Sequence, residues 1–127
     1  MCNTKVILCV DDEPVGLHAR RLLLSVAGYT VLTATSGKAA LGLFGCNPID
    51  LVVTDQLLPD LTGVEMIAEM KRIKPDVPVL LLTGLVDAPP GFEQADMLLS
   101  KGITPPEFLS AIARVISGSR AAGSATA

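Results

Sequence analysis

Polar side chains that are able to do chemistry stand directly after four strongly apolar runs of this sequence. They comprise carboxylates, a hydroxyl and an ammonium group, and in chain order they are Asp11, Asp12, Glu13, Asp55, Thr83 and Lys101. Clustered carboxylates repel one another, and a hard divalent cation such as Mg²⁺, which prefers oxygen ligands, relieves that repulsion. A carboxylate beside such a cation and a lysine can also attack a phosphoryl group, because the cations offset the charge on the phosphoryl oxygens. The residue types therefore indicate a Mg²⁺ site beside a nucleophilic carboxylate.

Five apolar runs of strand length recur along the chain and would position these residues. The runs cover residues 6–10, 30–34, 50–54, 79–82 and 97–100. They are almost continuously hydrophobic rather than alternating, which is typical of parallel strands covered on both faces. The spacing of apolar residues, with capping residues and prolines, predicts helices over residues 14–27, 37–45, 63–73 and from 105 to about 116. Pro89, Pro90 and Gly91 stand where a further helix would lie, so at most one or two turns fit there.

Strands that alternate with helices predict right-handed crossovers and a doubly wound α/β sheet. Ligands of such sheets bind beyond the carboxyl ends of the strands, which is where the polar residues fall. We interpret Asp55 as the nucleophile, with Thr83 and Lys101 holding the phosphoryl oxygens. Taken singly, each residue also has an ordinary structural explanation: the acidic residues 11–13 would cap a helix, Asp55 would lie in a turn, and Lys101 would be an exposed lysine. Their joint occurrence at four run ends favours the site.

The composition excludes several classes of protein. Half of the 127 residues are hydrophobic and 18% are charged, so the chain can build a core and is not wholly disordered. Aromatic residues make up only 3% and the net charge is -3, so neither a platform for stacking bases nor a basic surface is present, and direct nucleic-acid binding is not expected. The apolar runs are too short for a membrane span or a signal peptide. Cys2, Cys9 and Cys46 show no paired spacing, which suits reduced thiols in the cytoplasm.

The sequence resembles the receiver domains of bacterial two-component response regulators over about residues 5–117. The segments that carry the resemblance are VILCVDDEP at 6–14, GYTV at 28–31, ATSGKAAL at 34–41, DLVVTDQLLP at 50–59, Gly63, Thr83 with Gly84, and Lys101. The most specific part is the spacing of Asp55, Pro59 and Gly63, together with the acidic pair upstream. The resemblance implies a flavodoxin-like fold of five βα units, with five parallel strands in the order 2-1-3-4-5 and a shortened or irregular fourth helix.

The resemblance also implies a function in signalling rather than ordinary enzyme catalysis. Asp55 would accept a phosphoryl group from a histidine kinase, a phosphotransfer protein or a small phosphodonor, and the domain would catalyse only its own phosphorylation and dephosphorylation. By the same resemblance, the Mg²⁺ ligands would be Asp11, Asp12, Asp55 and the backbone carbonyl of Leu57. Thr83 and Lys101 would contact the phosphoryl group. Leu57 and Leu85 are apolar at positions flanking the site, so they cannot orient a hydrolytic water, and we predict slow loss of the phosphoryl group.

We expect the receiver domain over residues 1–117 and a flexible tail over residues 118–127, because the tail is small and polar without apolar periodicity. No segment of DNA-binding character follows residue 117, so a stand-alone receiver in the cytoplasm is the expected arrangement. The sequence identifies neither the downstream protein partner nor the oligomeric state, and a homodimer stays open.

Three departures from the family pattern keep an alternative open. The fourth helix is shortened, Leu98 stands where an aromatic residue is usual, and Gly102 stands where a proline commonly follows the lysine. These departures favour a degenerate receiver that acts as a phosphorylation-independent interaction or dimerisation module, whereas the retained polar set favours phosphorylation. A flavin carrier or a haloacid-dehalogenase-like phosphatase is a third interpretation. It is disfavoured because acidic residues 11–13 would repel a flavin phosphate, and adjacent aspartates replace the Asp-x-Asp of those phosphatases.

Overall fold

The computed structural model describes residues 4–84 and 90–120, and within these residues it holds one five-stranded sheet. The strands are β1 (Val6–Val10), β2 (Thr30–Ala34), β3 (Leu51–Asp55), β4 (Val79–Thr83) and β5 (Met97–Ser100). All neighbouring strands are parallel and the order is β2-β1-β3-β4-β5, which confirms the predicted topology. Every residue of β3 and β4 is buried, as their continuously apolar sequences predict. Asp55 and Thr83 are the last residues of their strands rather than the residues that follow them.

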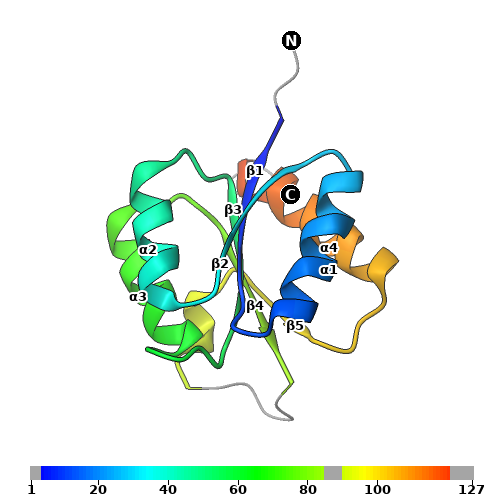
Figure 1. Ribbon diagram of the computed structural model, residues 1–127. Coiled ribbons are helices and arrows are strands. Elements are labelled where there is room, and N and C mark those ends of the chain that lie inside the picture. The colour runs from blue at the N-terminus through cyan, green and yellow to red at the C-terminus, as the bar shows by residue number, and fades with distance from the viewer. Residues whose placement is uncertain (1–3, 85–89, 121–127) are drawn as a thin grey trace.

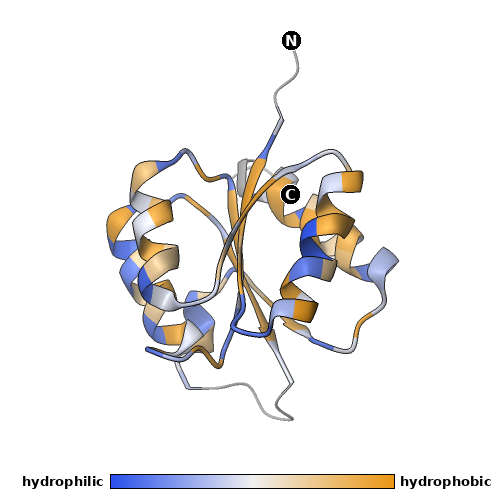
Figure 2. Cartoon of the chain, in the orientation of Figure 1, coloured by the Kyte–Doolittle hydropathy of each residue, from blue (hydrophilic) through white to orange (hydrophobic). Residues whose placement is uncertain are grey.

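Helices cover both faces of the sheet. They are α1 (Pro14–Val26), α2 (Gly37–Cys46), α3 (Gly63–Ile73) and α4 (Pro105–Arg120). Figure 1 shows α1 and α4 packed on one face and α2 and α3 on the other. Two cores result, one containing Leu24 and Ile112 beneath α1 and α4, the other containing Phe44 and Met70 beneath α2 and α3. The strands between them are strongly hydrophobic (Figure 2).

The helix ends follow local sequence signals. Gly28, with a φ of 105°, ends α1 in the left-handed conformation that glycine adopts most easily. The side chain of Thr62 accepts a hydrogen bond from the backbone N–H of Glu65, whose carboxylate in turn accepts one from the backbone N–H of Thr62. The same reciprocal arrangement joins Thr104 and Glu107 at the start of α4. These capping boxes confirm the predicted starts of the third and last helices.

The region between β4 and β5 contains only a short 3₁₀ turn (Phe92–Gln94) among its described residues, in agreement with the shortened fourth helix. Residues 85–89, which include Leu85 and Pro89, lie outside the described part of the chain. Gly91 precedes the turn with a φ of 87°, and a Cβ atom on it would come within 2.6 Å of Val64 Cγ1. Leu98 is partly buried and packs against the core beneath α2 and α3.

The last helix extends further than the sequence predicts. We expected the tail to begin at residue 118, whereas α4 continues to Arg120. The first three residues of the predicted tail are therefore helical, and the rest of it lies outside the described residues. None of the helices in the described part of the chain is long and apolar enough to cross a membrane.

Candidate functional site

Three carboxylates meet where β1 and β3 end. The two strands are paired, with Val10 opposite Thr54, so the chain leaves both at the same edge of the sheet. One carboxylate oxygen from each of Asp11, Asp12 and Asp55 lies within 4.8 Å of the others. Asp11 and Asp55 are almost completely buried, with 1% and 6% of their surface exposed, whereas Asp12 is exposed. The fold thus brings together the three aspartates that the sequence singled out.

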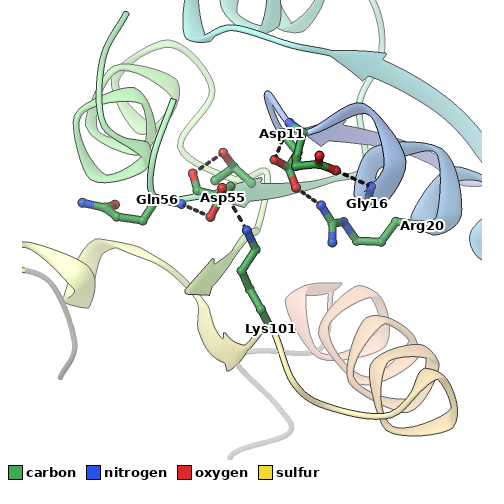
Figure 3. Close-up of polar contacts among 8 residues, drawn as sticks. Asp11, Gly16, Arg20, Asp55, Gln56 and Lys101 are labelled. Atoms are coloured by element: carbon green, nitrogen blue, oxygen red, sulfur yellow. Dashed lines mark hydrogen bonds and ion pairs between the residues drawn. The ribbon is translucent and has the colours of Figure 1, made fainter. Parts of the chain in front are cut away.

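The side chain of Asp55 is held from two sides. Its Oδ1 accepts a hydrogen bond of 2.8 Å from the backbone N–H of Gln56, and its Oδ2 lies 3.1 Å from the ammonium nitrogen of Lys101. Figure 3 shows the Lys101 side chain reaching Asp55 from the end of β5. The lysine is itself positioned through its main chain, because its backbone N–H donates to the carbonyl oxygen of Thr83 at 3.0 Å. The ends of β3, β4 and β5 therefore converge on one carboxylate.

A cavity of about 270 Å³ opens beside this carboxylate. Its lining consists of Asp55, Gln56, Leu57, Thr83, Gly84 and Lys101. Thr83 is buried, with 6% of its surface exposed, and Leu57 is 65% exposed at the rim. The cavity presents a carboxylate, a hydroxyl and an ammonium group to the same space. It offers room and polar groups for a small anion such as a phosphoryl group.

The loop after β3 is fixed to the start of α3 by Gln56. The side-chain oxygen Oε1 of Gln56 accepts a hydrogen bond from the backbone N–H of Val64, and its main-chain oxygen accepts one from Gly63, at 3.0 Å and 2.8 Å. Gln56 is buried and supplies acceptors to the first N–H groups of α3, which have no partner within the helix. This role could not be predicted from the sequence, because a glutamine beside Asp55 carries no distinctive spacing signal.

Glu13 does not join the cluster of aspartates. Its carboxylate accepts a hydrogen bond of 3.0 Å from the backbone N–H of Gly16 and caps the first turn of α1. The helix-cap interpretation of the acidic stretch is therefore correct for this residue. The side chain of Asp11 forms a similar local hydrogen bond, because its Oδ1 accepts from the backbone N–H of Glu13 at 3.0 Å.

Arg20 is a charged residue of the site that sequence analysis missed. Its guanidinium forms an ion pair with Oδ2 of Asp11, and only 18% of its side chain is exposed (Figure 3). A signal was available in the helical spacing, because Arg20 lies three residues after Leu17 and four before Leu24, both buried. An arginine on the buried face of an amphipathic helix requires an anionic partner, and Asp11 is that partner.

The donor set of the cluster fits Mg²⁺. All three groups are carboxylates, which are hard oxygen ligands, and two are buried where repulsion between like charges is strong. The two cationic side chains, Arg20 and Lys101, balance two of the three negative charges. One negative charge remains for a bound cation to neutralise.

Comparisons with known proteins agree with this geometry. The sequence model described as response regulator receiver domain matches residues 7–113. The transcriptional regulatory protein KdpE of Mycobacterium tuberculosis is 31% identical over 121 residues, which are 92% of this chain and 53% of that protein. The chain spans between 17% and 53% of the length of the curated relatives it matches.

Solved structures show the same architecture. A response regulator receiver domain from Clostridium thermocellum is 35% identical with a TM-score of 0.83, and the match covers 91% of this chain and 97% of that one. The response regulator TrrA of Thermotoga maritima, solved in complex with Mg²⁺ and BeF, is 30% identical with a TM-score of 0.84, covering 88% of this chain and 99% of the other.

Proposed function

This chain belongs to the response regulator receiver domain family, and from that membership we propose that it accepts a phosphoryl group on Asp55 in Mg²⁺-dependent signal transduction. The observation that carries the proposal is the buried carboxylate of Asp55, which faces a cavity shared with Thr83 and Lys101 and lies beside two further aspartates. A buried carboxylate cluster costs stability unless a partner or a ligand compensates it. Binding of Mg²⁺ and phosphorylation of Asp55 would supply that compensation.

The proposed reaction transfers a phosphoryl group from a phosphohistidine to the carboxylate of Asp55. A carboxylate oxygen forms a bond to phosphorus as the phosphorus–nitrogen bond breaks, and the electron pair of that bond stays on the imidazole. The ammonium group of Lys101, 3.1 Å from Oδ2, offsets negative charge on the transferred group. Thr83 lines the same cavity, and its hydroxyl would hold a phosphoryl oxygen.

Asp11, Asp12 and Asp55, with the backbone carbonyl of Leu57, are the residues that we propose hold Mg²⁺. The first three have carboxylate oxygens within 4.8 Å of one another, and Leu57 lines the cavity beside Asp55. When bound, Mg²⁺ would neutralise charge on the phosphoryl oxygens. The complex of TrrA with Mg²⁺ and BeF supports this assignment, since that response regulator structure has the same fold.

The phosphodonor is proposed to be a histidine kinase or a phosphotransfer protein that contacts α1. Three apolar side chains on this helix, Val15, Leu22 and Val26, are 75%, 46% and 87% exposed. With the exposed Ala19, they recur every three or four residues and form one stripe along the helix. Val15 lies three residues after Asp12, so the stripe begins next to the site. A partner bound there would place its phosphohistidine near the cavity. Whether the domain stands alone or belongs to a larger regulator is a separate question, and the stand-alone arrangement stays a prediction.

Mass spectrometry of the intact protein tests the function. The protein is incubated with acetyl phosphate, with and without Mg²⁺, alongside Asp55→Asn and the matched control Asp76→Asn, which alters an exposed aspartate outside the cluster. We expect a Mg²⁺-dependent gain of one phosphoryl group in the wild type and in the Asp76 variant, and none in the Asp55 variant. Absence of the adduct in the wild type, together with failure to bind beryllofluoride, would contradict the proposal.

A second candidate function is a phosphorylation-independent interaction or dimerisation module. The observation that favours it is the ion pair between Arg20 and Asp11, because a protein cation already occupies one of the carboxylates expected to bind Mg²⁺. If the wild type forms no phosphoryl adduct and does not bind beryllofluoride, this second function becomes the better supported of the two.

A further inference from the structure

We propose that Arg20 is an internal counter-cation that competes with Mg²⁺ for Asp11 and so sets the affinity of the domain for the metal. The inference rests on the proposed function, because it concerns the same carboxylate cluster. It adds a residue on α1 that controls how readily the cluster takes up a divalent cation.

Both carboxylate oxygens of Asp11 have donor partners. Oδ2 is paired with the guanidinium of Arg20, and Oδ1 accepts the backbone N–H of Glu13. With 1% of its surface exposed, Asp11 has little access to water, so these donors supply its stabilisation. A divalent cation approaching Asp11 must share or replace the bond to Arg20, and it meets the positive charge of the guanidinium at close range.

Gly16 leaves open space beside this contact. It lies one helical turn before Arg20, and a Cβ atom placed on it would be 3.6 Å from Arg20 Nη2 and 3.7 Å from Asp11 Oδ2. A side chain longer than that of alanine would crowd the guanidinium. Figure 3 shows Gly16 beside the paired side chains of Arg20 and Asp11, where even a methyl group would already be in van der Waals contact with both.

A second cavity, of about 290 Å³, adjoins the ion pair between α1 and the start of α4. Gly16, Ala19 and Arg20 line it on the α1 side, and Phe108 and Lys101 lie on the opposite side. The guanidinium therefore has free volume beside it. Release of Asp11 by Arg20 does not require the helices to separate, so exchange between arginine and metal is sterically feasible.

The charge balance gives the direction of the effect. Three carboxylates and the two cations Arg20 and Lys101 leave one net negative charge, because three minus two is one. Without Arg20, two negative charges would remain. Removing the arginine therefore increases the attraction of the cluster for Mg²⁺ and also removes a competitor for Asp11.

The test compares Mg²⁺ binding by the wild type with that of Arg20→Gln, Arg20→Lys and the matched control Arg21→Gln. Arg21 is the neighbouring arginine of α1, and its Nη2 lies 3.5 Å from the imidazole Nδ1 of His18. Mg²⁺ alone is titrated by isothermal calorimetry, and thermal unfolding is recorded with and without Mg²⁺. A charge-assisted hydrogen bond of ordinary strength corresponds to about a tenfold change in affinity.

We expect Arg20→Gln to bind Mg²⁺ about tenfold more tightly than the wild type, Arg20→Lys to lie between them, and Arg21→Gln to match the wild type. Mg²⁺ should raise the melting temperature of Arg20→Gln more than that of the wild type. If Arg20→Gln does not fold, the same comparison is made with Arg20→Lys.

Equal or weaker Mg²⁺ binding by the folded Arg20 variants overturns the inference and leaves the proposed function intact. A merely structural arginine would give this result, since its loss lowers stability without raising metal affinity. Failure of the wild type and all variants to bind Mg²⁺ overturns both the inference and the proposed metal site.

Discussion

A Cβ atom placed on Gly63 would lie 2.5 Å from the backbone carbonyl oxygen of Asp55. The first residue of α3 thus touches the main chain of β3 at the residue that carries the proposed phosphoryl group. Only glycine permits this approach, because the obstructing atom is main chain and cannot rotate away as a side chain does. The eight-residue spacing between Asp55 and Gly63 in the sequence therefore has a steric reason.

Substitution of Gly63 by alanine should destabilise the fold. The methyl group must push α3 away from β3, and overpacking of this kind costs about 2 kcal/mol. Urea denaturation measures the loss. Gly42→Ala is the matched control, because Gly42 lies in α2 with nothing within 4 Å of an added Cβ. That control should raise stability by up to ~1 kcal/mol, since alanine favours a helix more than glycine does. Equal effects of the two substitutions would contradict the steric explanation.

Asp60 should make the stability depend on pH in the acid range. Its carboxylate accepts hydrogen bonds of 2.8 Å from the backbone N–H groups of Gly37 and Lys38 at the start of α2, and these bonds lower the pKa of Asp60. Because the pKa is lowered on folding, the ionised carboxylate stabilises the folded state fully above the unfolded-state pKa of about 4. This stabilisation is lost as the pH falls through the lower folded-state pKa.

The corresponding experiment compares the unfolding free energy of the wild type and Asp60→Asn at neutral pH and at successively lower pH. We expect the wild type to be more stable at neutral pH, and the difference to shrink as the pH drops below about 4. A difference that stays constant across this range would show that the hydrogen bonds of Asp60 do not favour its ionised form.

Cys9 should be chemically inert in the folded protein. It lies in β1 with no exposed surface, and burial raises the pKa of its thiol to about 12. Since the thiolate is the reactive form, alkylation should fail until the protein unfolds. The variant with both Cys2→Ser and Cys46→Ser isolates this thiol. It should incorporate no iodoacetamide in buffer and one equivalent in concentrated urea, as measured by intact mass. Rapid labelling in buffer would mean that β1 opens readily.

Leu57 should prolong the life of the phosphoryl group. Its side chain stands at the rim of the Asp55 cavity and has no polar atom to orient a water molecule for hydrolysis. Leu57→Asn introduces an amide at the rim and should speed the loss of the phosphoryl group by about tenfold, which is less than the roughly hundredfold or more that a full general acid or base contributes. The decay is followed by intact mass after removal of the phosphodonor. The control is Leu22→Asn, which replaces an exposed leucine on α1. This variant should lose its phosphoryl group at the wild-type rate.

The strands and the doubly wound sheet could be predicted because the strands are short apolar runs separated by helical patterns. Their order followed from the resemblance to receiver domains. The grouping of Asp11 and Asp55 followed directly, since both stand at carboxyl ends of neighbouring parallel strands. The positions of these residues depend on the backbone alone, which is why sequence pattern was sufficient.

Two contacts that depend on the rotation of a helix or the folding of a loop were not predicted. Arg20 is nine residues from Asp11, and their pairing depends on the rotation of α1 about its axis. Gln56 binds α3 through a buried amide whose partner is fixed only by the folded loop. The end of α4 was misplaced for a different reason. Its last turns have no apolar periodicity, yet a helix that is already formed adds each further residue at small cost in free energy.

The two sides of the site differ in how tightly the sheet holds them. Asp55 ends a completely buried strand with a neighbour on each side, whereas Lys101 follows β5, an edge strand that is only partly buried and pairs with β4 alone. Local opening requires less free energy at such an edge than in the centre of a sheet. We therefore expect the carboxylate of Asp55 to move less than the ammonium group of Lys101 when a ligand binds, so that adjustment of the site falls on β5 and the start of α4.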